Sequence, residues 1–214
     1  MELYSTIVRF FQEGGVFMYP IVLVFALGLA IAIERWLYLT MTTAKNKALW
    51  SKITPHLKAG NFSAAAQMAS KSKAAIATIM TYGLNRVRSA RQREDIEKAM
   101  EESLMEVVPR LERRTHYLAI FANIATLLGL LGTIIGLIRA FTAVSNANPA
   151  EKADLLSASI SVAMNTTAFG LMVAIPLLLV HTLLQTKTTE IVDSLEMASV
   201  KFLNSISDRS EANV

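Results

Sequence analysis

Three uncharged, apolar stretches constrain what this chain can fold into. Residues 16–33 and 117–138 contain no charged side chain, and residues 155–186 contain one ionisable residue, His181. About 20 mostly apolar residues in a helix cross the roughly 30 Å hydrocarbon core of a bilayer, and a helix satisfies its own backbone hydrogen bonds there. We therefore predict an all-α, polytopic membrane protein with three transmembrane helices.

Composition excludes several other classes of protein. The 214 residues are 53% apolar and 18% charged, whereas soluble domains average about 25% charged residues. The apolar content and the nine glycines exclude a disordered chain and a collagen. Cysteine is absent from the sequence, which removes disulfides, thiol catalysis and thiolate metal ligands.

The N-terminus differs from a cleaved signal peptide. Such a peptide begins with basic residues, whereas the first 15 residues contain one Arg and two Glu. Leu3, Ile7, Phe10 and Phe11 recur at helical spacing. We therefore expect a retained amphipathic helix that lies in the membrane interface.

The distribution of Lys and Arg predicts the orientation of the spans. Residues 40–116 hold 14 of the 21 basic residues and seven acidic ones, a net charge of +7, whereas the loop after the second span holds only Arg139 and Lys152. Basic loops stay in the cytoplasm. The predicted segments are an interfacial helix on the periplasmic side (1–15), transmembrane helix one (16–39), a cytoplasmic helical domain (40–116), transmembrane helix two (117–138), a periplasmic loop (139–155), transmembrane helix three (156–186) and a cytoplasmic C-terminal helix and tail (187–214).

Apolar stripes extend the second and third spans beyond the membrane. One stripe comprises Ile96, Met100, Leu104, Val107 and Leu111, and the other comprises Ile191, Leu195, Ala198, Phe202 and Ile206. We expect one continuous helix over residues 93–144, bent at Pro109, and interpret both stripes as packing surfaces. Asn61 is expected to cap a short helix that follows it, and residues 73–87 are compatible with another.

Polar and small residues interrupt the apolar character of the second and third spans. Small residues at helical spacing let two helices approach closely, and polar groups in hydrocarbon favour partner helices or water. The hydroxyls therefore either hold helices together or border a hydrated path. The residues are Asn123, Thr126, Gly129, Gly132, Thr133 and Gly136 in the second span, and Ser157, Ser159, Ser161, Asn165, Thr166, Thr167 and Gly170 in the third.

Two motifs in these spans resemble a known family. The second span reads LLGLLGTIIG over residues 127–136, and the third reads NTTAFGLMVAIP over residues 165–176. With three spans and a basic loop after the first, the chain resembles the MotA/TolQ/ExbB proton channel family, and most closely its ExbB/TolQ-type members. Glu34 and Arg35 at the end of the first span add to the likeness to ExbB.

The resemblance implies a function that the composition alone does not. Family members of this type form a pentamer in the bacterial inner membrane around single-span ExbD/TolR-like partners, which supply a membrane Asp. Proton flow then does work on a TonB- or TolA-like envelope protein and supports outer-membrane transport. In this sequence Thr133 and Thr167 match the threonines of the ion path, with Thr166, Asn165 and Ser161 as further candidates. Gly129, Gly132, Gly136, Gly170 and Pro176 are expected to serve helix packing.

One position departs from the family pattern. ExbB and TolQ proteins commonly carry a Glu about five residues before the threonine of the third span, where this chain has Val162. A path of hydroxyls and amides is also compatible with Na⁺, so the ion stays open. The flagellar members of the family usually have four spans, which does not fit this sequence.

Two other classes of function compete with an ion pathway. The chain could be a non-conducting membrane scaffold that oligomerises through Gly129, Gly132 and Gly136. An enzyme is the weaker reading, because the three histidines, His56, His116 and His181, are isolated and no phosphate-binding loop occurs. We expect neither a cofactor nor a metal.

Overall fold

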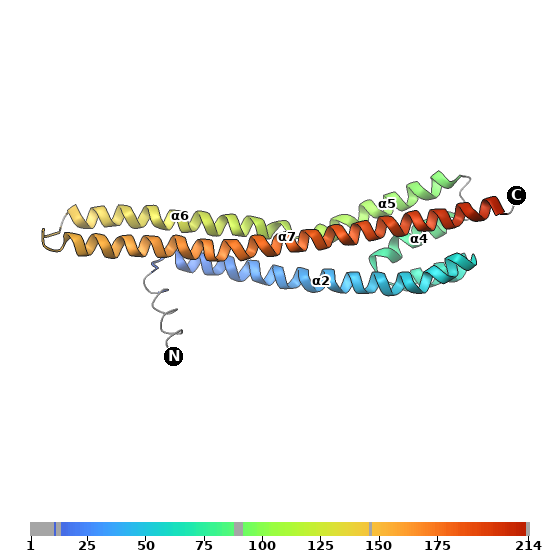
Figure 1. Ribbon diagram of the computed structural model, residues 1–214, viewed down its shortest axis with the longest axis horizontal. Coiled ribbons are helices and arrows are strands. Elements are labelled where there is room, and N and C mark those ends of the chain that lie inside the picture. Colours follow the sequence, from blue (N-terminus) through green and yellow to red (C-terminus); the bar gives the residue numbers. More distant parts are fainter. Residues whose placement is uncertain (1–10, 12–13, 88–91, 146, 213–214) are drawn as a thin grey trace, which may run out of the picture. The chain divides into compact units, whose positions relative to one another are not determined.

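The computed structural model describes residues 11, 14–87, 92–145 and 147–212, with side chains described up to residue 207. Every regular element in these residues is a helix, as Figure 1 shows, which confirms the predicted all-α class. The helix expected over residues 1–15 lies largely outside the described residues. The helices are α2 (Met18–Ala59), α3 (Phe62–Ser70), α4 (Ala75–Val87), α5 (Arg93–Glu112), α6 (His116–Ser145) and α7 (Lys152–Ala212).

Three helical stretches are long and apolar enough to cross a membrane. They are Met18–Ala59, Arg93–Ser145 and Lys152–Ser207, and each contains all or most of one of the apolar segments found in the sequence. The connection between α6 and α7 is short, since only residues 146–151 separate the two helices.

The chain divides into two compact units. We call Met1–Glu34 with Arg114–Leu183 the apolar unit, and Arg35–Arg113 with Leu184–Val214 the charged unit. Helices α2 and α7 contribute residues to both units, whereas α6 lies in the apolar unit and α3, α4 and α5 lie in the charged unit.

Most of the buried residues of α6, in the apolar unit, are small, and many of its large side chains are exposed. On α6 the buried residues include Ala122, Ala125, Gly129 and Gly132. Large side chains on the same helix point outward, and they include Leu127, Leu130, Ile134, Ile138 and Phe141. In lipid the exposed apolar surface is solvated by acyl chains, while small side chains let backbones approach. This distribution is the one expected for helices that cross a bilayer.

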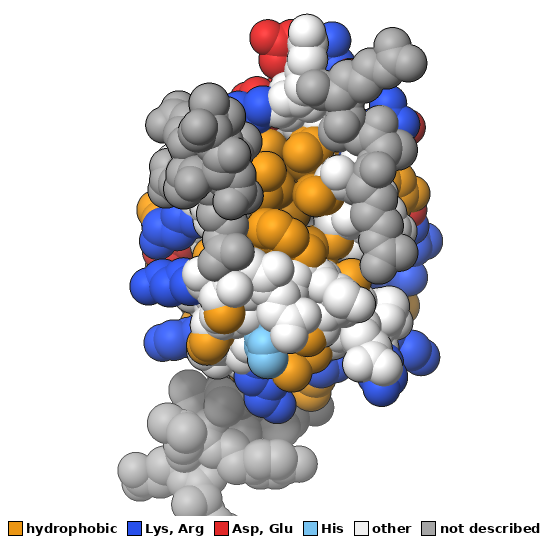
Figure 2. Space-filling model, turned by 90° about the vertical axis from the view of Figure 1, so that its right-hand side faces the viewer, with side chains coloured by type: hydrophobic (Ala, Val, Ile, Leu, Met, Phe, Trp, Pro, Cys, Tyr) orange, Lys and Arg blue, Asp and Glu red, His pale blue; other side chains and the backbone are white. Residues whose placement is uncertain are grey.

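The charged unit has an apolar core made by the two stripes that the sequence predicts. Met100, Leu195 and Phe202 are all buried. A Cβ added to Gly83 of α4 would lie 2.8 Å from the Met100 sulfur and 2.9 Å from Phe202 Cε1, so α4, α5 and α7 meet closely there. The prediction of core packing is confirmed for most of both stripes. In Figure 2 hydrophobic side chains gather near the centre of the drawn face, with Lys and Arg around its periphery.

The prediction of one continuous helix over residues 93–144 is wrong. Helix α5 ends at Glu112 and α6 begins at His116, with Arg114 between them at φ +68°. Pro109 stays inside α5, so the break lies beyond the proline that was expected to bend the helix. The backbone N–H of Arg113 and the guanidinium of Arg35 donate to carbonyls of the last turn of α5. These carbonyls therefore do not need hydrogen bonds from a further turn of helix.

Local signals elsewhere in the charged unit are confirmed. Asn61 is the N-cap of α3, and its side-chain oxygen accepts a hydrogen bond of 3.1 Å from the backbone N–H of Ala64. Helix α4 occupies most of the segment that was expected to be helical over residues 73–87.

Candidate functional site

The structure brings the hydroxyl groups of Thr133 and Thr167 into direct contact. Thr133 lies on α6 and Thr167 on α7, and either hydroxyl can donate to the other. The Thr167 hydroxyl also lies 2.9 Å from the backbone oxygen of Gly129, and the Thr133 hydroxyl lies 3.2 Å from that of Ala163. Both threonines are half-buried. The two residues thus form a hydroxyl pair between α6 and α7.

Glycines permit this close crossing. A Cβ added to Gly129 would lie 3.3 Å from the Gly170 Cα, and one added to Gly170 would lie 2.6 Å from the backbone oxygen of Ala125. A Cβ on Gly136 would lie 2.8 Å from the Cβ of Ala163. The carbonyl of Gly129 is therefore accessible to a side chain of the opposite helix, and the threonine hydroxyl uses it.

Thr166 has a different neighbourhood from Thr167. Its side chain is almost fully buried, and its hydroxyl lies 2.6 Å from the backbone oxygen of Gly14 and 2.9 Å from that of Val162. A hydroxyl with these partners fixes the segment before α2 against α7. The contact favours a positioning role for this threonine.

The remaining two candidates lie on another face of α7. Asn165 precedes Thr167 by two positions, which places it about 200° around the helix, and Ser161 lies one helical turn before Asn165. Asn165 is half-buried and Ser161 is exposed. The structure therefore does not bring these residues to the hydroxyl pair. They form, with the exposed Ser157, a polar stripe on an otherwise apolar segment.

A small cavity lies beside Thr166 in the apolar unit. Its volume is about 120 Å³, and Gly132, Ser159, Val162, Thr166 and Arg139 contribute to its lining. A water molecule occupies about 30 Å³ in the liquid, so the cavity has room for a few waters. Val162 gives the cavity an apolar wall at the position where the family pattern has a carboxylate.

The hydroxyl pair can exchange hydrogen bonds but cannot carry a proton by titration. Hydroxyls donate and accept hydrogen bonds and remain neutral at physiological pH. Residues 117–138 and 155–180 contain no Asp, Glu, Lys, Arg or His. These two segments therefore supply no acidic group of their own to the hydroxyl pair.

Charged and aromatic residues cluster where the first span ends. Within the apolar unit Glu34 forms an ion pair of 3.5 Å with Arg114. Within the charged unit the Arg35 guanidinium lies 4.7 Å from the centroid of the Tyr38 ring and donates to the backbone oxygen of Leu111. Sequence reasoning missed this role of Arg35, because its acceptor is 76 residues away and no local pattern identifies it.

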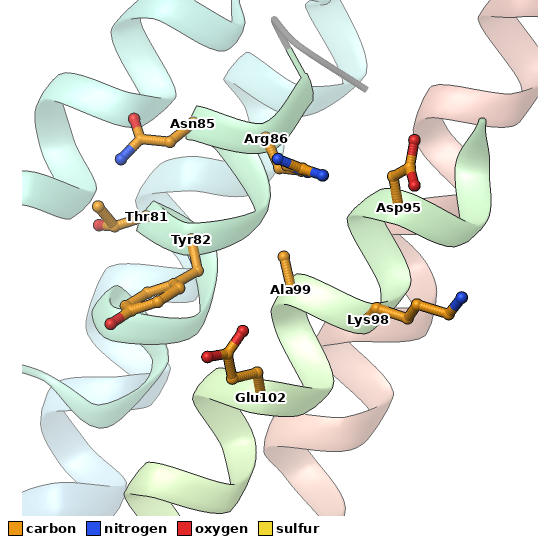
Figure 3. Close-up of a pocket in the computed structure, with 8 residues that line it drawn as sticks. All are labelled: Thr81, Tyr82, Asn85, Arg86, Asp95, Lys98, Ala99 and Glu102. Atoms are coloured by element: carbon orange, nitrogen blue, oxygen red, sulfur yellow. The ribbon is translucent and has the colours of Figure 1, made fainter. Parts of the chain in front are cut away.

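A mixed-charge cleft lies between α4 and α5 in the charged unit. Figure 3 shows that α4 contributes Tyr82 and Arg86 while α5 contributes Asp95, Lys98 and Glu102. Its volume is about 570 Å³. Both signs of charge line the cleft and most of these side chains are exposed, so it selects no particular ligand. Among the described residues, no group of His, Asp and Glu is placed to hold a metal ion.

Comparison with known proteins identifies the family to which this chain belongs. Residues 71–197, more than half of the chain, match the MotA/TolQ/ExbB proton channel family. An ExbB homologue of Methanothermobacter thermautotrophicus, named for biopolymer transport, is 26% identical over 92% of this chain and 69% of its own length. An ExbB-like biopolymer transport protein of Synechocystis is 30% identical over 81% of this chain and 68% of its own length. The Tol-Pal system protein TolQ of Haemophilus influenzae is 32% identical over 44% of this chain and 41% of its own length. With three apolar helices and this match, the chain is a multi-pass membrane protein that belongs to the MotA/TolQ/ExbB family.

Proposed function

We propose that this chain is an inner-membrane subunit of an ion-driven motor that works with an ExbD/TolR-like partner. The partner supplies an Asp to the hydroxyl pair, and proton flow past that Asp does work on a TonB- or TolA-like envelope protein. In this proposal the chain forms a pentamer, needs no cofactor and catalyses no covalent chemistry.

The contact between Thr133 and Thr167 carries the proposal. It places two neutral hydroxyls at a tight helix crossing within a segment that has no titratable group of its own. A hydroxyl can donate to a carboxylate and can accept from its protonated form, so the pair suits both states of an incoming Asp. The energy scale is adequate, since one charge that crosses 100 mV releases about 2.3 kcal/mol.

Two alternatives are separated by experiment. A Na⁺-driven member of the family would use the same hydroxyls and carbonyls, because oxygen ligands also suit this cation. A non-conducting scaffold is compatible with the fact that both hydroxyls already have acceptors within the chain. Gly129, Gly132 and Gly136, through which it was expected to oligomerise, instead contact residues of the same chain, so such a scaffold would have to associate through another surface.

The test is ion flux in proteoliposomes that contain this chain and its co-expressed single-span partner. We expect proton uptake under an imposed potential in the wild type, and its loss in Thr133→Val and Thr167→Val. Thr133→Ser and Thr167→Ser, which keep the hydroxyl, should retain flux. Thr126→Val is the matched control, because in the described part of the chain the Thr126 hydroxyl donates within its own helix, to Ala122 at 3.1 Å.

The outcomes distinguish the readings. Wild-type flux in both valine variants would contradict the path assignment. Flux that requires a Na⁺ gradient and not a proton gradient would favour the Na⁺-driven alternative. A purified complex whose mass accounts for copies of this chain alone, with no flux, would favour the scaffold.

A further inference from the structure

A further cavity in the charged unit combines basic side chains with apolar and aromatic ones. Its volume is about 180 Å³, the space of about six liquid waters and less than a drug-sized ligand occupies. All of its lining residues belong to the charged unit, whereas the hydroxyl pair lies in the apolar unit. Helix α2 contributes Tyr38, Met41 and Lys45, the segment before α4 contributes Lys73, and α5 contributes Arg110 and Leu111.

The charged side chains that line this cavity are all positive. They are Lys45, Lys73 and Arg110, and no Asp or Glu is among the described residues of the lining. Arg110 pairs with Glu106, one turn earlier in α5, at an exposed place where water screens the pair. In the described part of the chain neither lysine forms an ion pair, so both ammonium groups are available to an anion.

Two neighbouring features add to the positive potential. The Arg35 guanidinium lies 4.7 Å from the centroid of the Tyr38 ring, and that ring lines the cavity. The first turn of α4 also lines it, and the N-terminus of a helix carries a partial positive charge. Together with the two unpaired lysines, these features favour an anionic group with several oxygen acceptors, such as a phosphate.

Along α2 the lining changes from aromatic and apolar to basic with distance from the predicted span. Tyr38 lies at the end of predicted transmembrane helix one, Met41 follows, and Lys45 lies seven residues beyond Tyr38, about 10 Å along the helix. Side chains of a helix lean toward its N-terminus, so the lysine leans back toward the span. On α5, Leu111 is the lining residue nearest in sequence to the second span. A phospholipid with its acyl chains in the bilayer therefore presents its head in the direction of the lysines.

We propose that this cavity binds the phosphate head of an anionic phospholipid. The phosphate oxygens accept hydrogen bonds from Lys45 and Lys73, and the glycerol and first acyl carbons pack on Tyr38, Met41 and Leu111. The small volume admits the head group alone, so the rest of the acyl chains stays in the bilayer. The site does not depend on the proposed ion pathway, because no residue is shared between the two.

The cysteine-free sequence allows occupancy to be measured at the cavity itself. Thr42→Cys places a single thiol in the lining, and a bound lipid should slow its reaction with N-ethylmaleimide. We would measure this rate in the full-length protein in dodecyl maltoside with increasing dioctanoyl phosphatidylglycerol. Ser51→Cys, exposed on the same helix outside the cavity, controls for effects of the lipid on the micelle or the reagent. Met41→Cys, at an exposed position of the lining, serves if the Thr42→Cys thiol does not react.

Two comparison probes separate the sources of the anion. Dioctanoyl phosphatidylcholine has no net charge, and glycerol 3-phosphate has no acyl chains. We expect saturable protection of Thr42→Cys by phosphatidylglycerol, and protection by the other two only at concentrations at least tenfold higher. The reaction rate of Ser51→Cys should stay unchanged with all three.

Removal of one lysine at a time tests the assigned donors. In the Thr42→Cys background, Lys45→Gln or Lys73→Gln should weaken the protection about fivefold, since a lysine near an anionic lipid contributes about 1 kcal/mol. Lys47→Gln and Lys71→Gln are the matched controls, because each lies two residues away at an exposed position outside this cavity. We expect each control to change the affinity less than twofold.

Several results would overturn the proposal. Equal protection by phosphatidylcholine would show a cavity without anion selectivity, and equal protection by glycerol 3-phosphate would show a site for a soluble anion. Absence of protection in both cysteine variants would show that the lipid does not occupy the cavity. Equal weakening by Lys45→Gln and Lys47→Gln would show a diffuse attraction to the basic region, and unchanged affinity in Lys45→Gln and Lys73→Gln would remove the assigned donors.

Discussion

At the scale of the residue, the most consequential side chains of this protein are polar groups that complete a helix from a distance. Asn46 caps the start of α4 from α2 through the 3.2 Å hydrogen bond to the backbone of Ile76. Arg35 does the same for the end of α5, where its guanidinium donates to the carbonyl of Leu111. Such contacts stabilise helix termini, which otherwise leave backbone groups without partners.

Arg35→Met should destabilise the protein. The side chain is 3% exposed, so its loss leaves the Leu111 carbonyl in a buried place without this donor, at a cost of about 1–3 kcal/mol. Lys52→Met, at an exposed position of the same helix, is the control and should lie within about 0.5 kcal/mol of the wild type. Unfolding of the two variants in detergent, followed by circular dichroism, measures the difference. Equal stability of both variants would show that the Arg35 contact contributes nothing.

At the scale of the element, the crossing of α6 and α7 depends on the absence of side chains. Gly170→Ala should weaken this crossing, because the new Cβ would lie 2.6 Å from the Ala125 backbone oxygen and 3.1 Å from the Gly129 Cα. Unlike a side chain, these backbone atoms cannot relieve the clash by rotating. We expect a loss of about 1–3 kcal/mol, the usual cost of overpacking. Denaturation by sodium dodecyl sulfate of the purified protein is the measurement.

Gly28→Ala is the matched control for that variant. The three atoms nearest to its Cβ would be the two methyl carbons and Cγ of Leu177, the nearest at 2.8 Å, and this flexible side chain can rotate. Alanine also has the higher helix propensity, by about 1 kcal/mol. We expect Gly28→Ala to be close to neutral. If Gly170→Ala were equally neutral, the close backbone approach would not be needed for stability.

Elements were predictable where the signal is local, and were missed where it is not. Local signals predicted the apolar runs, the two stripes and the Asn61 cap, because the residues of each one lie close together in the chain. The break between α5 and α6, at Arg113–Thr115, contains no glycine or proline that would mark it in the sequence. The Leu111 carbonyl near the end of α5 accepts a hydrogen bond from Arg35, which is distant in the chain. The family resemblance predicted Thr133 and Thr167 as residues of the ion path, but their direct contact was not predicted, because it depends on how α6 and α7 are aligned in the fold.

At the scale of the whole molecule, the charges predict the side of the membrane on which each loop lies. The excess of Lys and Arg over residues 40–116 predicts that this region is cytoplasmic and that the α6–α7 connection faces the periplasm. Topology is therefore the prediction on which the proposed function depends.

The absence of cysteine makes that topology directly testable. Single cysteines at two exposed positions, Ala150→Cys in the α6–α7 connection and Ser51→Cys in α2, can be labelled with a membrane-impermeant maleimide in spheroplasts. We expect Ala150→Cys to react in intact spheroplasts and Ser51→Cys to react only after the membrane is permeabilised. The wild type, which has no thiol, gives the background. The reverse pattern would show that the chain has the opposite orientation in the membrane. Labelling of both cysteines in intact spheroplasts would show that both positions lie on the periplasmic side, which contradicts a single crossing between them.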